Sequence, residues 1–467
     1  MDFKNLRALS QPAAKPPEKC RHMQTIKLRT GIWYNDHAIE LRFPLDWDVR
    51  TYWPDTPPVL SVARIKERLN SPMGQPPLRE LAKGKRKPLI IVDDLSRPTP
   101  VYQIMPLLLE EFGSAGIPAE NIRILVAAGT HGNQNHYALE KKIGREAFGA
   151  CQIIVHNDKK KCRLVGRTSY ATPVYVNPAV LDSDLVCGVG GIYPQHTTGF
   201  GGGSKLALGV LGRKSIVHLH YGKHKSVAGT YNIENTFRRD LDEIARIIGL
   251  STIFTLHIDG CSQLVNLTCG DHFAYYPEAA AFSRKAYAAP LPHDADVVIA
   301  NTYPSDISYT FMRKGLKPVR CATPDAVRIA VGYNYEGIGR HGIFPQGKNQ
   351  RLNQMHALFL RMSTMDKKEI IAKLIKNLSP RSNKMNPPQP HAASAGTILS
   401  ESLEGMWLYR PEGESLPLPE IDGIRITRQW ESVLEHIEKK FANRQSLRVA
   451  VYPCAPLQCL EHAGRKN

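Results

Sequence analysis

The stretch RKPLIIVDDLSRPTP, residues 86–100, decides the expected fold of this 467-residue chain. Its apolar run ends abruptly in two aspartates and a turn with two prolines. A short run that is apolar at every position is typical of a strand buried on both faces of a parallel sheet. Similar runs lie in NIRILVAAGTHG (121–132), CQIIVHND (151–158) and SDLVCGVGG (183–191). With a helix between the first two, they predict an α/β fold with mostly parallel sheets.

A second αβ series follows a proline-containing connection at residues 290–294. It begins with ADVVIANTY (295–303), continues with a helix over about 308–317, and reaches AVRIAVGYN (326–334). The break predicts two α/β domains, an N-terminal one over 1–290 and a C-terminal one over 291–467. A site in the cleft between them is the natural expectation.

Four further segments complete the second series. We expect a surface loop over 379–396, which is rich in Pro, Ser and Asn, a strand near Met406, a helix over 427–441 and a final strand in SLRVAVYP (446–453).

The composition narrows the class of protein. Lys and Arg outnumber Asp and Glu by 61 to 43, a net charge of +18 that would steer small acids or phosphorylated cofactors to the protein. The basic residues are spread without interleaved aromatics, which argues against nucleic-acid binding. Nine cysteines without a CxxC pair indicate reduced thiols. With no apolar leader and no run of about 18 apolar residues, we expect a cytoplasmic protein that binds no membrane.

Polar side chains follow two of the predicted strands. Asp94 and Arg97 come after the first strand and His131 after the second. Open α/β sheets bind ligands at the carboxyl ends of their strands, where an arginine can clamp a carboxylate. A solvated strand end and a capping histidine are the plain structural alternatives.

The stretch GIYPQHTTGFGGGSK (191–205) is rich in glycine but matches neither common nucleotide motif. A P-loop needs glycine before its lysine and a hydroxyl after it, whereas Ser204 precedes Lys205 and Leu206 follows. The dinucleotide pattern fails because its last position is Ser204. Glycines here either form a tight turn or let backbone N–H groups approach an anion.

A third candidate is HLHYGKH (218–224), which carries three histidines. Alternate histidines would share one face of a strand, so a metal site is open here, although an isolated HxH pattern is weak evidence.

Taken in order, these motifs resemble the nickel-pincer-dependent lactate racemases and the broader set of 2-hydroxyacid racemases and epimerases. The resemblance covers about residues 25–345. It rests on DDLSRPTP, GTHG, PQHTTGFGGGSK, GRKSIVHLH, SDISYTFMRKGL and EGIG. It implies two α/β domains around the cofactor.

The resemblance also implies a cofactor and its anchors. Lys205 matches the lysine joined through a thioamide to a pyridinium mononucleotide that carries nickel. His220 matches the histidine that ligates nickel beside two sulfurs and a ring carbon. Enzymes of pincer synthesis would supply this nucleotide. The remaining matched cofactor-binding positions are Asp94, Arg97, Gly201, Gly202 and Gly203.

The implied reaction inverts the Cα of a 2-hydroxy acid through a transient 2-keto acid, with the cofactor taking and returning the hydride. His131 matches one of two acid/base histidines, because a neutral imidazole near pH 7 can take a proton and return it. Arg97 and Lys314 match the cations that hold the substrate's carboxylate.

The chain departs from the family at three places. Gln195 stands where the second catalytic histidine is expected, and His196 comes one residue later. A loop can aim His196 into the site as the base, whereas an extended backbone would present Gln195 instead. Phe311 replaces a glutamine of lactate racemases, which predicts a hydroxy acid larger than lactate. Gly132, where the family often has arginine, also indicates an altered pocket.

Two alternatives remain on the sequence alone. One is a catalytically silent homologue that binds nickel and the pincer cofactor. The other is an NAD-dependent dehydrogenase, although the glycine fingerprint for that cofactor is missing. The substrate, the choice between racemisation and epimerisation, and the number of subunits stay open.

Overall fold

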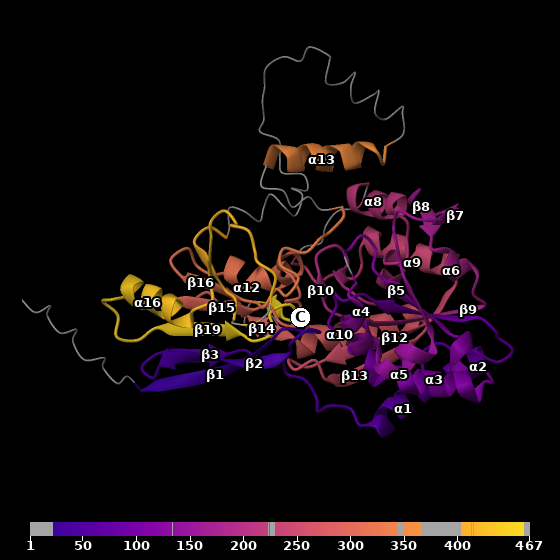
Figure 1. The fold of residues 1–467 in the computed structure, drawn as a ribbon, viewed down its shortest axis with the longest axis horizontal. Helices are drawn as coiled ribbons and strands as arrows, with labels where there is room; N and C mark the ends of the chain where they lie inside the picture. The colour runs from indigo at the N-terminus through magenta and orange to yellow at the C-terminus, as the bar shows by residue number, and fades with distance from the viewer. Residues whose placement is uncertain are drawn as a thin grey trace, which may run out of the picture.

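The structure is a computed structural model that describes residues 22–132, 134–222, 224, 229–343, 350–365, 403–411, 413 and 415–461. Two six-stranded sheets dominate it (Figure 1). In spatial order the first sheet is β13 (Leu264–Gly270), β12 (Leu250–Ile258), β9 (Leu185–Gly191), β4 (Pro88–Asp93), β5 (Arg123–Ala127) and β6 (Gln152–Val155). The second is β18 (Ile424–Thr427), β17 (Met406–Tyr409), β16 (Val327–Val331), β15 (Val297–Asn301), β19 (Arg448–Tyr452) and β3 (Asp48–Thr51).

Within these two sheets every pair of neighbouring strands is parallel except β12 with β13. The prediction of an α/β fold with mostly parallel sheets is therefore confirmed. Four two-stranded pairs add to it: β1 (Met23–Thr30) with β2 (His37–Pro44), β7 (Arg163–Arg167) with β8 (Pro173–Val176), β10 (Pro194–Gln195) with β11 (Gly199–Phe200), and β14 (Ala288–Pro290) with β20 (Cys459–Glu461).

The helices connect the strands and cover the sheets. In the first half they are α1 (Val62–Asn70), α2 (Leu78–Leu81), η1 (Val101–Gln103), α3 (Met105–Ser114), η2 (Ala119–Asn121), α4 (His136–Ile143), α5 (Arg145–Ala150), α6 (Pro178–Leu181), α7 (Lys205–Leu208), α8 (Arg213–Tyr221), α9 (Thr236–Ile247) and α10 (His272–Ala286). In the second half they are α11 (Tyr309–Met312), η3 (Arg313–Leu316), α12 (Lys317–Arg320), α13 (Gln350–Met362) and α16 (Trp430–Lys440). None of the helices described here is long and apolar enough to cross a bilayer.

The apolar runs form strands whose side chains are buried on both faces of the sheet. In β4, Leu89 and Ile91 belong to one core, while Ile90 and Val92 belong to another on the opposite face. Every residue of β4 is buried. Polar side chains are therefore excluded until the strand ends, which is why the first ones, at Asp93 and Asp94, lie at the sheet edge.

The N-terminal strands belong to the second sheet. β3 pairs in parallel with β19, and Leu28, Leu41 and Phe43 from the β1–β2 hairpin share a core with Val297 of β15. Figure 1 accordingly shows the indigo β1–β3 beside β15, β19 and α16, apart from the first sheet. The division at residue 290 stays a prediction, and the second sheet draws on residues from both sides of it.

One predicted local structure is wrong. HLHYGKH was expected to present histidines on a strand, but His218 and His220 lie on helix α8. Ile216, Val217 and Leu219 of this helix are buried. Their spacing is that of the buried side of a helix, whereas buried residues of a strand would alternate with exposed ones. The predicted loop over 379–396 lies outside the described residues.

Candidate active site

A carboxylate and a histidine meet where two parallel strands end. Asp94 follows β4, His131 follows β5, and the Nδ1 of His131 lies 2.6 Å from Oδ2 of Asp94. Burial opposes ionisation, but the electrostatic interaction and hydrogen bond with His131 outweigh it and hold the pKa of Asp94 below its ordinary value. Because a carboxylate only accepts, His131 donates from Nδ1 and keeps its lone pair on Nε2. The pair has the arrangement of an oriented general base.

The loop after β4 is fixed by a buried ion pair. Lys142 is fully buried, and its Nζ lies 2.8 Å from Oδ1 of Asp93. The same ammonium donates to the carbonyl oxygens of Arg97 and Thr99, at 2.9 and 3.1 Å. Breaking a buried ion pair is costly because it leaves an uncompensated charge. The pair and the two hydrogen bonds therefore hold residues 94–99 in one conformation.

His131 also contacts residues from the second half of the chain. Its ring meets the rings of Phe311 and His341, each at a centroid distance of 4.8 Å. His131 and His341 form an antiparallel bridge, in which Gly132 N donates to the Arg340 carbonyl at 3.1 Å. Burial and the nearby His131 hold the pKa of His341 well below its ordinary value. Both halves of the chain therefore contribute to the surroundings of the dyad.

Cations gather around His196. Burial lowers the pKa of His196 to about 4, and the positive charges of Lys205, Lys314, Arg97 and Arg313 act in the same direction. Burial likewise holds the pKa of Lys314 well below its ordinary value. Both side chains are nevertheless exposed to water. His196 and Lys314 are therefore accessible positions among positive charges, and together with Arg97, Lys205 and Arg313 we call them the cationic cluster. Such a cluster attracts anions.

Lys205 and His220 share one aromatic neighbour. Phe237 of α9 is buried, with Lys205 Nζ 5.5 Å from its ring centre and the His220 ring 5.2 Å from it, edge to face. Burial, with Arg97 and Arg238, lowers the pKa of Lys205 to about 7. A substantial share of this amine is therefore neutral near pH 7, as a nucleophilic lysine requires.

His220 has the chemical state of a metal ligand. Its Nδ1 lies 2.8 Å from the carbonyl oxygen of Ile216, which can only accept, so Nδ1 carries the hydrogen and Nε2 the lone pair. Burial and the charge of Lys205 lower the pKa of His220 to about 3, which keeps the ring neutral. In metal-binding histidines, a hydrogen bond from the nitrogen that does not bind the metal fixes the tautomer in this way. The residues present thus fit a metal held by His220 beside a group on Lys205.

Gln195 is engaged within its own loop. Its Oε1 accepts from the backbone and hydroxyl of Thr197, at 2.8 and 2.6 Å, and from those of Thr198, at 2.9 and 3.0 Å. Four bonds to one oxygen brace the turn between β10 and β11. This arrangement favours His196 over Gln195 as the side chain available for proton transfer.

The glycine run is a tight turn held through its carbonyl groups. Gly202 and Gly203 have φ of +72° and +58°, a region that favours glycine. Arg238 donates to the carbonyl oxygens of Phe200 and Gly202, and Tyr276 donates to that of Gly201. The Gly201 amide donates to the Tyr193 carbonyl at 2.7 Å. The turn thereby places Lys205 at the start of α7, and cofactor binding by the three glycines stays a prediction.

Replacing Gly203 by alanine is expected to destabilise the fold by about 1–3 kcal/mol. The added Cβ would lie 2.5 Å from a ring carbon of Tyr276, at a backbone conformation that alanine rarely adopts. Denaturant unfolding measures the loss. Gly113→Ala in α3 is the matched control, because its Cβ would meet nothing within 4 Å. Equal midpoints for the two variants would contradict the expectation.

The other two histidines of HLHYGKH have structural partners. His224 Nε2 lies 2.7 Å from Oδ2 of the buried Asp240, and Thr172 donates to the same oxygen at 2.6 Å. The Thr172 hydroxyl in turn lies 2.9 Å from Nδ1 of His218. These contacts connect α8 to α9. They give His218 and His224 a structural role, whereas His220 lies beside Phe237.

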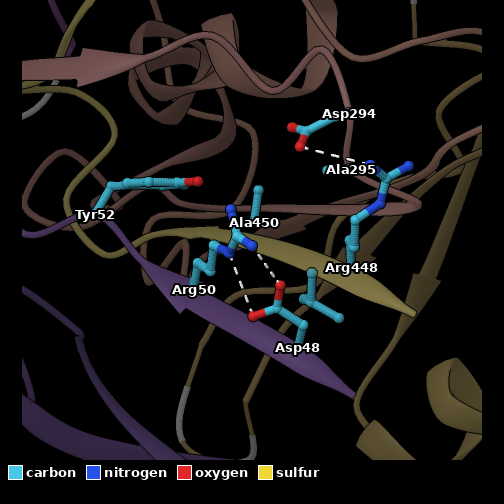
Figure 2. A pocket seen from close by; sticks show the side chains of 8 residues that line it. Asp48, Arg50, Tyr52, Asp294, Ala295, Arg448 and Ala450 are labelled. Atoms are coloured by element: carbon cyan, nitrogen blue, oxygen red, sulfur yellow. Dashed lines mark hydrogen bonds and ion pairs between the residues drawn. The ribbon is translucent and has the colours of Figure 1, made fainter. Parts of the chain in front are cut away.

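Two other features of the described residues offer no better candidate site. Among the described residues, no three His, Cys, Asp or Glu side chains gather to hold a metal, so a metal on His220 would need its other ligands from a bound group. Figure 2 shows a hollow at the edge of the second sheet, where Arg50 pairs with Asp48 at 2.6 Å and Arg448 with Asp294 at 3.6 Å. Its volume of about 10 Å³ has room for no more than a water molecule.

Comparison with known proteins shows what the chain is similar to. Residues 34–230 match the lactate racemase N-terminal domain. The chain is therefore similar to lactate racemases over much of its length. A lactate racemase of Lactiplantibacillus plantarum is 28% identical over 289 residues, which are 60% of this chain and 68% of that protein. A second, from Thermoanaerobacterium thermosaccharolyticum, is 28% identical over 290 residues, or 59% and 68% of the two chains.

The solved structures agree in fold. The lactate racemase apoprotein of Thermoanaerobacterium thermosaccharolyticum superimposes with a TM-score of 0.64 at 20% identity, over 94% of this chain and all of that one. A Thermotoga maritima protein gives a TM-score of 0.54 at 16% identity, over 88% of this chain and all of that one.

Sequence reasoning reached most of the dyad and the cationic cluster. Direct contacts join Asp94 to His131 and His131 to Phe311, and electrostatic influence joins Arg97, His196, Lys205, His220 and Lys314. It missed His341, Phe237, Arg313 and Ser96, whose hydroxyl donates to Asp94 at 2.8 Å. Of these, only Ser96 and Arg313 lie inside a quoted motif. The contacts of Phe237 and His341 depend on the tertiary fold.

Proposed function

We propose that this protein inverts the Cα of a 2-hydroxy acid, as a nickel-dependent racemase or epimerase. The supporting observation is a base oriented by a carboxylate, Asp94–His131, together with a second histidine, His196, on which several cations act. Relatives named lactate racemase support an activity of the racemase type.

In this proposal His131 exchanges the proton of the substrate hydroxyl. Nε2 carries the lone pair, and the negative charge of Asp94 stabilises the imidazolium that forms. His196 does the same from the opposite face, because its depressed pKa keeps it neutral and ready to accept a proton. A proton site on each face is what inversion of a stereocentre requires.

Arg97 and Lys314 would hold the substrate carboxylate. The charge of Arg97 contributes to lowering the pKa of Lys314, so the two side chains are close enough to interact. Lys314 Nζ lies 3.5 Å from the Ser96 carbonyl oxygen, beside the dyad. A fixed carboxylate keeps the Cα in place while its geometry changes. Desolvation depresses the pKa of Lys314, and the charge of an anion bound beside it would offset this effect and favour the ammonium form.

Lys205 and His220 would hold the nickel pincer nucleotide, Lys205 through its neutral amine and His220 through Nε2. When bound, that group supplies an acceptor for the Cα hydrogen. Arg238, which stacks 3.9 Å from the Tyr276 ring centre and donates to the glycine turn, keeps the lysine in place.

Phe311 favours a substrate larger than lactate. Its ring contacts that of His131, and Lys314 Nζ lies 5.2 Å from its centre. A ring at this position offers apolar surface and no hydrogen bond to a small hydroxy acid. Longer or aromatic hydroxy acids should therefore have higher kcat/KM than lactate, and a preference for lactate over all of them would contradict this.

His196→Ala is expected to lower the rate of inversion by about 10²–10⁴-fold, because it removes the proton carrier of one face. Gln195→Ala should act mainly on the turn that its side chain braces, with a smaller effect on rate than on thermal stability. Chiral chromatography and thermal unfolding of both variants separate the two roles. Retained inversion in His196→Ala, with loss in Gln195→Ala, would contradict this assignment.

The decisive experiment follows both stereochemistry and the Cα hydrogen. The chain, produced together with pincer-synthesis enzymes, is given single enantiomers of several 2-hydroxy acids, unlabelled and deuterated at Cα. Inversion that retains the deuterium supports the proposal. Inversion with loss of deuterium to water contradicts hydride chemistry. A protein that binds nickel and nucleotide but inverts none of the acids would be the silent homologue instead.

A further inference from the structure

A cavity of about 490 Å³ adjoins His131. Its walls come from both halves of the chain and include His131, Gly132, Asp158, Lys159, Arg213 and Arg340. The volume lies within the range of about 300–1,000 Å³ that is usual for small-molecule sites. Lys205, His220 and Phe237 do not line it, so the cavity adjoins the proton-transfer dyad and not the lysine anchor.

The cavity carries an excess of positive charge. Arg213 pairs with Asp158 at 3.2 Å and donates to the Gly342 carbonyl oxygen at 2.6 Å, so its charge is balanced and its position fixed. Lys159 and Arg340 are exposed, and neither has a carboxylate partner within the described ranges. Two uncompensated cations in a concave site attract an anion more strongly than they would on a flat surface.

The backbone fixes Arg340 beside the dyad. Gly132 N donates to the Arg340 carbonyl at 3.1 Å, and Gly342 N donates to the Thr130 carbonyl at 2.7 Å. A Cβ on residue 132 would lie 3.1 Å from the Cβ of Arg340, so glycine there permits this approach. The cation therefore comes from the second half of the chain, on a segment anchored next to His131.

From this arrangement we infer that the cavity is a second anion-binding subsite, which takes the distal carboxylate of a 2-hydroxy dicarboxylate whose hydroxyl-bearing carbon faces His131. The inference rests on the proposed function and specifies its substrate class. The first carboxylate stays with Arg97 and Lys314, and the second reaches Lys159 and Arg340. His131 lines this cavity and is also the proposed base, so the reacting carbon and the distal carboxylate meet at one residue.

The kinetic test compares substrates of equal length. Racemisation is measured for 2-hydroxy dicarboxylates of four to six carbons and for the corresponding monocarboxylates, with the wild-type protein and with Arg340→Gln and Lys159→Gln. We expect the dicarboxylates to have the lower KM in the wild type. Each variant should raise the dicarboxylate KM by about 10-fold or more and leave the monocarboxylate KM unchanged, because a charge-assisted bond is lost. Arg425→Gln, at an exposed arginine over Trp407, is the matched control.

Two kinetic outcomes would overturn the subsite. One is an equal KM change for both substrate classes. The other is a fall in nickel and nucleotide content of Arg340→Gln with unchanged substrate preference, which would assign the cavity to the nucleotide phosphate.

A binding test keeps the subsite separate from the proposed function. Calorimetric titration of the full chain, made without the pincer-synthesis enzymes, uses succinate and butyrate as probes. Tighter binding of succinate, lost in Arg340→Gln and retained in Arg425→Gln, supports the subsite even if no hydroxy acid is inverted. Equal binding of the two probes, or a succinate preference that survives Arg340→Gln, overturns it even if the protein is a racemase.

Discussion

Asp94→Asn is expected to lower the rate of hydroxy-acid inversion by about 10²–10⁴-fold while substrate binding is largely retained. The carboxylate accepts the Nδ1 hydrogen of His131 at 2.6 Å and so keeps the lone pair on Nε2. An asparagine amide at the same place can donate to Nδ1, which would move the hydrogen to Nε2 and remove the base. The measurement is kcat and KM by chiral chromatography on the cofactor-loaded protein.

A double variant gives the sharper test. If Asp94 acts only through His131, then Asp94→Asn in a His131→Ala background should cost little more than His131→Ala alone, because the residues work as a unit. Asp36→Asn, which breaks an ion pair with Arg29 of 2.8 Å, controls for loss of a carboxylate elsewhere. Multiplicative losses in the double variant would contradict the dyad. The pKa of Asp94 lies below its ordinary value, so its titration should not set the acidic limit of activity.

The dyad was accessible to sequence reasoning because it depends on local rules. All-apolar runs such as β4 bury both faces, so the first polar residue marks the end of the strand. Neighbouring parallel strands end at the same edge, which brings Asp94 and His131 together. The acid/base role of His131 came only from the resemblance to the lactate racemases, and its contact with Asp94 was not predicted.

The N-terminal strands were not accessible in this way. In β1 exposed and half-buried residues alternate along most of the strand, and β3 has no buried residue. The place of β3 is set by pairing with β19, as in the pair of Val49 with Val449, which are 449 − 49 = 400 positions apart. No local pattern encodes a partner at that separation.

The candidate site shows the same limit. His341 is one polar residue in a loop, and only its bridge to His131 gives it meaning. Gln195 and His196 were ambiguous because the sequence does not show which side chain a turn will use. The structure engages Gln195 through four contacts to Oε1, which the two threonines after His196 make possible.

Lys205→Ala is expected to abolish covalent attachment of the pincer nucleotide. Protein made with the pincer-synthesis enzymes should show a mass above that of the bare chain and bound nickel, and the variant should show neither. Lys205→Arg should fail as well, because a guanidinium stays protonated and cannot form the thioamide. Lys214→Ala, at an exposed lysine on the same stretch over the Tyr175 ring, should load normally. A variant at residue 205 that still gains the mass would place the anchor elsewhere.

The reason for this specificity is the state of the amine, which can be tested without the cofactor. Burial with Arg97 and Arg238 lowers the pKa of Lys205 to about 7. Above that pH the folded protein holds the amine neutral, whereas an ordinary lysine with a pKa near 10.4 stays charged until far higher pH. Acetylation by a trace of acetic anhydride, followed by peptide mass spectrometry, should therefore rise at Lys205 with a midpoint near pH 7. The exposed Lys214, followed in the same digests, is the reference lysine. If the two lysines share one profile, the amine is not activated by its surroundings, and attachment at Lys205 would have to depend on the supplying enzymes alone.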